Sequence, residues 1–215
     1  MPFSGPLVAI LLAVTVGQAH AQTLNWARSF GANANDLIAG VDTDASGNVY
    51  IAGSFIFTVD FDPGPGTALA SSNGGADLFI LKLGANGTFV WVRTFGGTEF
   101  EGPFSIAVNS GGDVVVGGTY HVGFDFDPGP GTAFAPPLGD ISNPDAFVVK
   151  FDTDGDFQWV YPLNSTAIVE AYATFDSLGN VLITGEIGGT IDFDAGVGTA
   201  NATATGNFEA YILKV

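Results

Sequence analysis

The sequence predicts an all-β protein that contains three copies of one small antiparallel sheet. Four motifs recur three times in the same order, at intervals of 64 to 68 residues. Short segments rich in β-branched and aromatic residues lie between Gly, Asn and Asp, which is typical of strands joined by tight turns. No window has the 3.6-residue periodicity of an amphipathic helix, and the 31 Gly and 11 Pro disfavour long helices.

The first segment, residues 1–21, is predicted to be a signal peptide. Residues 7–16 are apolar except for Thr15, and this stretch is too short to span a membrane. Ala19-His20-Ala21 supplies the small-x-small pattern of a cleavage site, so the mature chain would begin at Gln22 and be exported. A buried N-terminal strand is the alternative for the same pattern. No later segment is long and apolar enough to cross a membrane.

The repeats that follow run over about 31–95, 96–163 and 164–215. In the first repeat we expect four strands, at 39–42, 48–55, 78–83 and 89–95, that form a meander. The four motifs that define the repeat are Trp26, Trp91 and Trp159; Ser46–Gly53, Gly111–Gly118 and Leu178–Gly185; Asp60–Thr67, Asp125–Thr132 and Asp192–Thr199; and Asp77–Lys82, Asp145–Lys150 and Glu209–Lys214. We expect the acidic motif, DFDPGPGT in its first copy, in the long connection between the second and third strands.

Together these motifs resemble the bacterial β-propeller repeat known as the SBBP repeat. The resemblance rests on SGNVY at 46–50, DFDPGPG at 60–66, FILKL at 79–83 and FVW at 89–91, and it covers about residues 24–215. It implies one propeller blade per repeat in exported or cell-surface bacterial proteins, and no particular activity. The third copy departs from the pattern, because Ala195 and Val197 replace two prolines.

The phase of the strands predicts how the array ends. Residues 24–30, which contain Trp26, correspond to the fourth strand of a blade, whereas the chain ends just after a third strand. The opening strand is therefore predicted to complete the last blade. Because propellers usually have about 4–8 blades, three blades imply a β-propeller-type open arc, a fragment of a longer array, or half of a six-bladed ring. A three-fold β-trefoil or β-prism is the alternative fold, and the exposed blade faces of an arc predict a homo-oligomer.

Six carboxylates in the acidic motifs are candidate calcium ligands. In Asp60-Phe61-Asp62 an extended chain places both carboxylates on one face, and carboxylate and carbonyl oxygens are the ligands that Ca²⁺ prefers. The other two copies supply the equivalent pairs Asp125, Asp127, Asp192 and Asp194. The alternative is that these side chains accept hydrogen bonds from backbone N–H groups in turns. Solvated β-turns are also the interpretation of the acidic runs at 42–44 and 152–156.

Three lysines and three tryptophans each occupy one repeat position. Lys82, Lys150 and Lys214 are expected to pair with an acidic loop or to keep a strand edge soluble. The tryptophans are expected to pack between blades, and a row of exposed rings for sugar stacking is the alternative.

Composition excludes several classes of function. The formal charge of −17 disfavours binding to nucleic acid, and the absence of Cys excludes disulfides, thiolate catalysis and Cys-ligated metal sites. His121 is the one histidine after the predicted cleavage site, and the carboxylates that glycoside hydrolysis would use are not repeated: Glu99, Glu101, Glu170 and Glu186. The sequence therefore predicts an exported, non-catalytic binding or structural module for a protein or glycan ligand, with calcium as its candidate cofactor. A secreted glycan-acting enzyme or lectin is the alternative.

Overall fold

The structure is a computed structural model that describes residues 23–32, 34–137, 143–167, 169–196 and 198–215. The predicted signal peptide lies outside these residues. All regular secondary structure in the described part is β, as predicted. None of the described residues forms a helix with the length and apolarity needed to cross a membrane.

The first repeat forms a four-stranded antiparallel sheet, which we call blade 1. Its strands are β1 (Leu37–Thr43), β2 (Val49–Phe55), β5 (Asp77–Leu83) and β6 (Phe89–Phe95), in the order β1-β2-β5-β6. All four were predicted within two residues at each end, and the largest difference is that β1 begins two residues earlier than predicted. The turns Asp44–Asn48 and Gly84–Thr88 each contain a glycine with a positive φ angle, 78° at Gly47 and 76° at Gly87. Glycine adopts such angles without strain.

The second and third repeats form blades 2 and 3. Blade 2 consists of β7 (Gly102–Val108), β8 (Val114–Tyr120), β11 (Asp145–Phe151) and β12 (Phe157–Leu163) in the same antiparallel order. Blade 3 has three strands, β13 (Tyr172–Phe175), β14 (Val181–Ile187) and β17 (Glu209–Lys214), so β17 lies at the edge of its sheet in the described residues. A short hairpin joins the second strand of each blade to the third: β3 (Thr58–Asp60) with β4 (Leu69–Ser71), β9 (Phe124–Asp125) with β10 (Phe134–Ala135), and β15 (Thr190–Asp192) with β16 (Asn201–Thr203).

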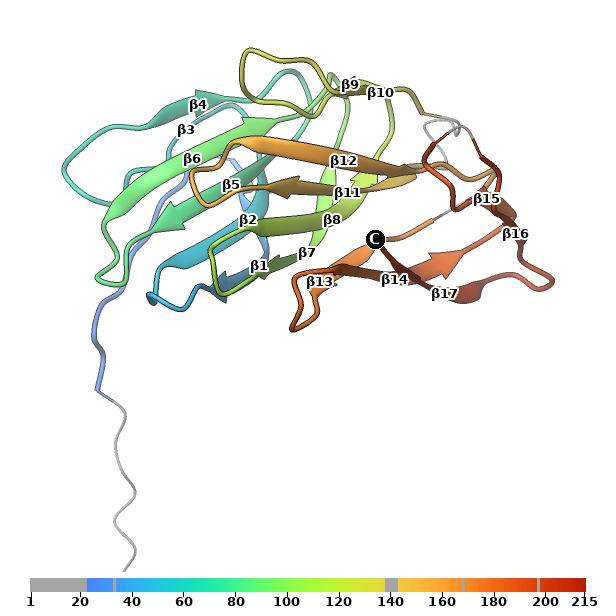
Figure 1. Cartoon of the computed structure of the whole chain (residues 1–215). Coiled ribbons are helices and arrows are strands. Elements are labelled where there is room, and N and C mark those ends of the chain that lie inside the picture. Colours follow the sequence, from blue (N-terminus) through green and yellow to red (C-terminus); the bar gives the residue numbers. More distant parts are fainter. Residues whose placement is uncertain (1–22, 33, 138–142, 168, 197) are drawn as a thin grey trace, which may run out of the picture.

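The blades follow one another around an arc and pack face to face (Figure 1). Their first strands β1, β7 and β13 contact one another in succession, and apolar side chains fill the space between neighbouring sheets. Tyr50 and Ile80 of blade 1 share one core with Val116 and Phe147 of blade 2. A second core joins blades 2 and 3. This propeller-like stacking of separate sheets is the predicted fold class, and it differs from the trefoil or prism alternative.

Residues 23–30 lie against blade 1, on the side that faces away from blade 2. Trp26 and Phe30 pack on a third core that contains Phe61 and Phe79. This segment and β17 are at opposite ends of the arc in Figure 1, and no described residue of the segment pairs with β17. The predicted completion of the third blade by residues 24–30 is therefore absent from this single chain.

Candidate interaction site at the open end of the arc

The carboxylates of the acidic motif fasten the tips of the three short hairpins. Oδ1 of Asp60 accepts hydrogen bonds from the backbone amides of Asp62 and Ala68 at 3.1 and 2.8 Å, and Oδ1 of Asp62 accepts one from the amide of Gly64 at 2.7 Å. The same three bonds recur in the other two copies, which contain Asp125, Asp127, Asp192 and Asp194. In the third copy these bonds lower the pKa of Asp192, mainly through the amides of Ala200 and Asp194.

This geometry explains most of the motif. A Cβ at Gly66 would lie 2.1 Å from Oδ2 of Asp62, so a side chain at that position would displace the carboxylate. The intervening Phe61 is fully buried and anchors the loop in the core. The observed bonds match the turn-forming alternative, and no group of three or more His, Cys, Asp or Glu side chains in the described residues is arranged to hold a metal. Calcium at the six aspartates stays a prediction.

The second class of acidic turns behaves as predicted. Oδ1 of Asp152 accepts hydrogen bonds from the amides of Asp154 and Asp156 at 3.0 and 2.9 Å. Oδ1 of Asp44 likewise accepts hydrogen bonds from the amides of Ser46 and Asn48. These side chains stabilise β-turns between neighbouring strands of one sheet.

A tryptophan and an arginine connect blade 1 to blade 2. In β6, Nε1 of Trp91 donates to the carbonyl oxygen of Thr153 at 3.2 Å, and the guanidinium of Arg93 donates to the carbonyl oxygens of Gly155 and Asp154, both at 2.8 Å. These acceptors form the turn between β11 and β12 of blade 2. The guanidinium also lies over the indole, 5.4 Å from the ring centroid. A fourth-strand side chain thus recognises the backbone of a turn in the following blade.

Lys82 strengthens the same junction. Its ammonium group donates to the carbonyl oxygen of Thr153 at 2.8 Å and lies 4.9 Å from the centre of the Tyr50 ring. The side chain is buried between blades, whereas Lys150 and Lys214 form ion pairs with Asp113 and Asp176 of their own blades. The lysines therefore pair with turn residues, and none of these contacts involves the acidic motif.

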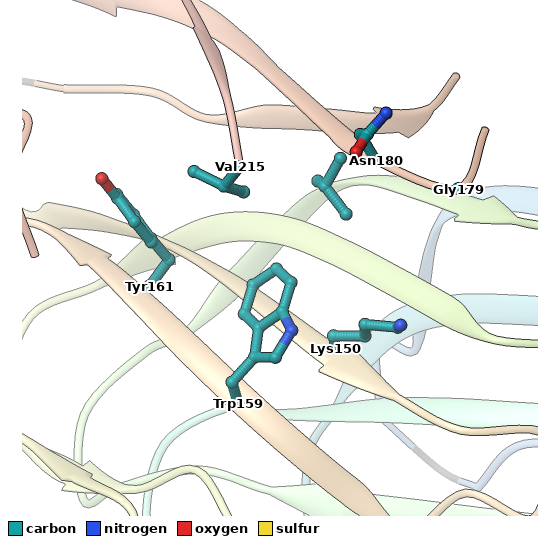
Figure 2. A pocket seen from close by; sticks show the side chains of 7 residues that line it. Lys150, Trp159, Tyr161, Gly179, Asn180 and Val215 are labelled. Atoms are coloured by element: carbon teal, nitrogen blue, oxygen red, sulfur yellow. The ribbon is translucent and has the colours of Figure 1, made fainter. Parts of the chain in front are cut away.

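The third tryptophan lies beside an open cavity. Trp159 occupies the same position in β12 as Trp91 in β6, and Tyr161 replaces the arginine. The cavity has a volume of about 340 Å³. Figure 2 shows the indole beside Val215, Lys150 and Asn180, which also line it. At the other junction this position is filled by the turn that follows the third strand of the next blade. The described chain ends at Val215, just before the corresponding turn.

The outer face of blade 3 is also uncovered. Ile212 shares its repeat position with Ile80 and Val148; these two are 1% and 0% exposed, whereas Ile212 is 73% exposed. Ile212, Tyr172 and Leu182 line a shallow apolar groove of about 330 Å³. Together with the free edge of β17 and the Trp159 cavity, this groove makes up what we call the open end. In blade 1 the edge of β5 is paired with β6, and blade 2 covers the positions equivalent to the groove and to the cavity.

Glu101, one of the carboxylates considered for catalysis, is enclosed. Glu101 is 2% exposed. Its Oε2 accepts a hydrogen bond from the amide of Gly97 at 3.1 Å, whereas its buried Oε1 has no hydrogen-bond partner. Burial, with a smaller effect from the charges of Asp77 and Glu99, raises the pKa of Glu101 to about 8. Burial also raises the pKa of Asp77. Because Glu101 is enclosed, its unusual pKa is a property of the junction between blades 1 and 2.

Glu99 lies close enough to Glu101 for its charge to raise the pKa of Glu101, whereas Glu186 lies in β14 of blade 3. Glu170 accepts a hydrogen bond from the hydroxyl of Tyr172 at the open end, and its backbone amide bonds to the carbonyl oxygen of Glu186. His121 places Nδ1 2.7 Å from the carbonyl oxygen of Phe100.

No family model matches this chain. It is similar to an uncharacterized WD repeat-containing protein of Acanthamoeba polyphaga mimivirus, with 27% identity over 191 residues. The matched region covers 74% of this chain and spans 13% of the length of the viral protein. WD repeats build β-propellers, so this similarity agrees with the propeller-like stacking of the blades.

Sequence reasoning missed the role of the arginines. Arg28 and Arg93 are the only two arginines, and each stands two residues after a tryptophan. With the three repeated lysines, all five cations of the chain therefore occupy two repeat positions. That regularity was available as a signal for a junction between blades.

Proposed function

We propose that this protein is a non-catalytic binding module that takes up an extended β-strand at its open end. The exposure of Ile212 carries the proposal, because the same repeat position is fully covered in both other blades. An isoleucine in this setting is expected to lie under a neighbouring sheet.

Strand addition is the mode of recognition that these features support. The unpaired edge of β17 offers backbone hydrogen bonds to an incoming strand, and the groove beside Ile212 and Leu182 offers apolar contacts for its side chains. The Trp159 cavity offers space for the turn that precedes such a strand. The expected partner segment has alternating apolar residues and carries a cation, because the protein has a formal charge of −17.

A peptide with the sequence of β6 tests this function. We would add residues 88–96, TFVWVRTFG, to the isotope-labelled protein and follow its amide resonances. The expected result is a shift of the amides in β17 and around Trp159. A peptide of the same composition in scrambled order serves as the control. The absence of any specific shift in dilute protein, in which single copies prevail, would refute the proposal.

Two substitutions locate the binding site. Ile212→Asp places a charge in the groove and should weaken peptide binding at least about tenfold, as loss of a central apolar contact does. Leu69→Asp is the matched control, because Leu69 is also exposed but lies on the hairpin of blade 1. Equal affinities of the two variants would contradict the proposed site.

The proposal includes export and the SBBP family. The predicted signal peptide and the repeat motifs support both. Expression in bacteria followed by N-terminal sequencing tests export: a mature chain that begins at Gln22 in the periplasm or medium is expected. An uncleaved chain that stays in the cytoplasm would contradict it.

A further inference from the structure

We infer that the strand that completes blade 3 comes from a second copy of this chain, so that two copies close a six-bladed ring. In this arrangement residues 23–30 of each copy pair with β17 of the other. The inference rests on the proposed function, since it names the partner of the open end.

Residues 23–30 already have the contacts of a fourth strand. Nε1 of Trp26 donates to the carbonyl oxygen of Ala85 at 3.0 Å, and the guanidinium of Arg28 donates to the carbonyl oxygens of Gly87 and Asn86 at 3.0 and 3.4 Å. These are the bonds that Trp91 and Arg93 form with blade 2. The segment is therefore placed as the fourth strand of a preceding blade, whose other three strands are not among the described residues.

Blade 3 supplies the strands that this segment lacks. It has a first, second and third strand, and the described residues leave the outer edge of β17 unpaired. A second copy can add its segment 23–30 to this edge while the segment keeps its contacts with its own blade 1.

The two ends of the arc both expose apolar side chains. Val41 shares its repeat position with Ile106, which packs against blade 1, but Val41 itself is exposed. Its exposed neighbours in β1 are Leu37 and Ile38. The end formed by blade 1 thus offers an apolar surface to the groove beside Ile212, as expected for an association driven by apolar burial.

The number of blades selects two copies. Head-to-tail contacts close into a ring when the rotations add up to a full turn, and otherwise produce filaments. Propellers have about 4–8 blades, and six is the only multiple of three in that range.

The register of the new pairing follows from blade 1. In β5 and β6, Lys82 is opposite Trp91, Leu81 is opposite Val92 and Ile80 is opposite Arg93. The equivalent pairs between copies are Lys214 with Trp26, Leu213 with Ala27, and Ile212 with Arg28. Lys214 would then approach the indole of the second copy as Lys82 approaches that of Trp91, whose ring centroid is 6.0 Å from its Nζ.

Light scattering coupled to size-exclusion chromatography tests the stoichiometry. The full chain is expected to have twice the mass of one copy, Ile212→Asp to have the mass of one copy, and Leu69→Asp to remain at twice the mass. A single-copy mass for the unmodified chain at all concentrations would overturn the ring. Masses that increase without limit would also overturn it, because they indicate an open filament.

Disulfide trapping tests the register. The chain has no cysteine, so Ala27→Cys and Leu213→Cys introduce the only two thiols. Opposed residues of paired strands are close enough for a disulfide, so an oxidised mixture of the two single variants should give a cross-linked pair. Each variant alone should give none, and no cross-link in the mixture would refute the pairing. If the β6 peptide binds at β17 but the chain is monomeric, the binding function stands and only the second copy is excluded as its partner.

Discussion

Truncating equivalent tryptophans should have very unequal effects on stability. Trp91 and Trp159 occupy the same repeat position, but Trp91 is 9% exposed and bonded to the turn of the next blade, whereas Trp159 borders the open cavity. We would compare Trp91→Ala with Trp159→Ala in the Ile212→Asp background, which keeps the open end free. The comparison measures what the junction between two blades contributes.

The expected difference follows from burial. Removing a buried tryptophan costs about 3–5 kcal/mol of stability. The lost hydrogen bond from the indole N–H to Thr153 accounts for about 1 kcal/mol of this cost. Trp159 is partly exposed and no turn covers it, so its truncation should cost about 1–2 kcal/mol. Trp91→Ala should therefore be less stable by about 2–3 kcal/mol.

Urea unfolding at 25 °C, followed by far-ultraviolet circular dichroism, measures both free energies of unfolding without relying on tryptophan fluorescence. If Trp91→Ala is unfolded in water, Trp91→Phe and Trp159→Phe retain an aromatic ring and should differ in the same direction, by about 1 kcal/mol for the hydrogen bond. Equal losses for the two positions would refute the role assigned to the junction.

Three further predictions concern glycine, pH and calcium. Gly117→Ala should destabilise the protein by about 1–3 kcal/mol because its Cβ would lie 2.4 Å from a carbonyl oxygen at the start of blade 3, whereas Gly206→Ala, in open space, should not; thermal unfolding compares them. The pKa of Glu101 is raised to about 8 in the folded protein, from an ordinary value of 4.5. Between these two pH values the folded state binds one more proton than the unfolded state does. The free energy of unfolding should therefore fall as the pH rises through this window, by at most about 1.4 kcal/mol per pH unit. Glu101→Gln should flatten this dependence and the exposed control Asp154→Asn should not; a wild-type profile without a fall would contradict the assignment. If the acidic motifs bind calcium, added Ca²⁺ should raise the melting temperature above that in EDTA, and Asp127→Asn should reduce the effect; identical melting in both conditions would exclude calcium.

The main strands could be predicted from sequence because their signals are local. Segments such as Val49–Phe55 combine β-branched and aromatic residues with a glycine turn at one end, and this pattern recurs three times. The hairpins β3/β4, β9/β10 and β15/β16 were missed as strands because they contain only two or three residues each. Such short ladders depend on the Asp60 and Asp62 hydrogen bonds, which a propensity argument does not contain.

The open end could be predicted only in outline. Strand counting indicated a missing fourth strand and exposed blade faces, and the structure identifies the residues concerned. The position of Ile212 in the sequence is equivalent to that of Ile80, so only the placement of the blades reveals that one is covered and the other is not. The Trp-x-Arg contacts were missed because each donor is about 60 residues from its acceptor.

Hydrogen exchange along the third strands tests whether β17 has an unpaired edge that a partner strand can cover. In dilute protein, where single copies prevail, the amides of β5 and β11 should be protected because they have partners on both sides, whereas the outward amides of β17 should exchange rapidly. Raising the protein concentration or adding the β6 peptide should slow exchange in β17. If β17 is as protected as β5 in dilute protein, and neither treatment changes its protection, blade 3 has no open edge and does not bind a partner strand there.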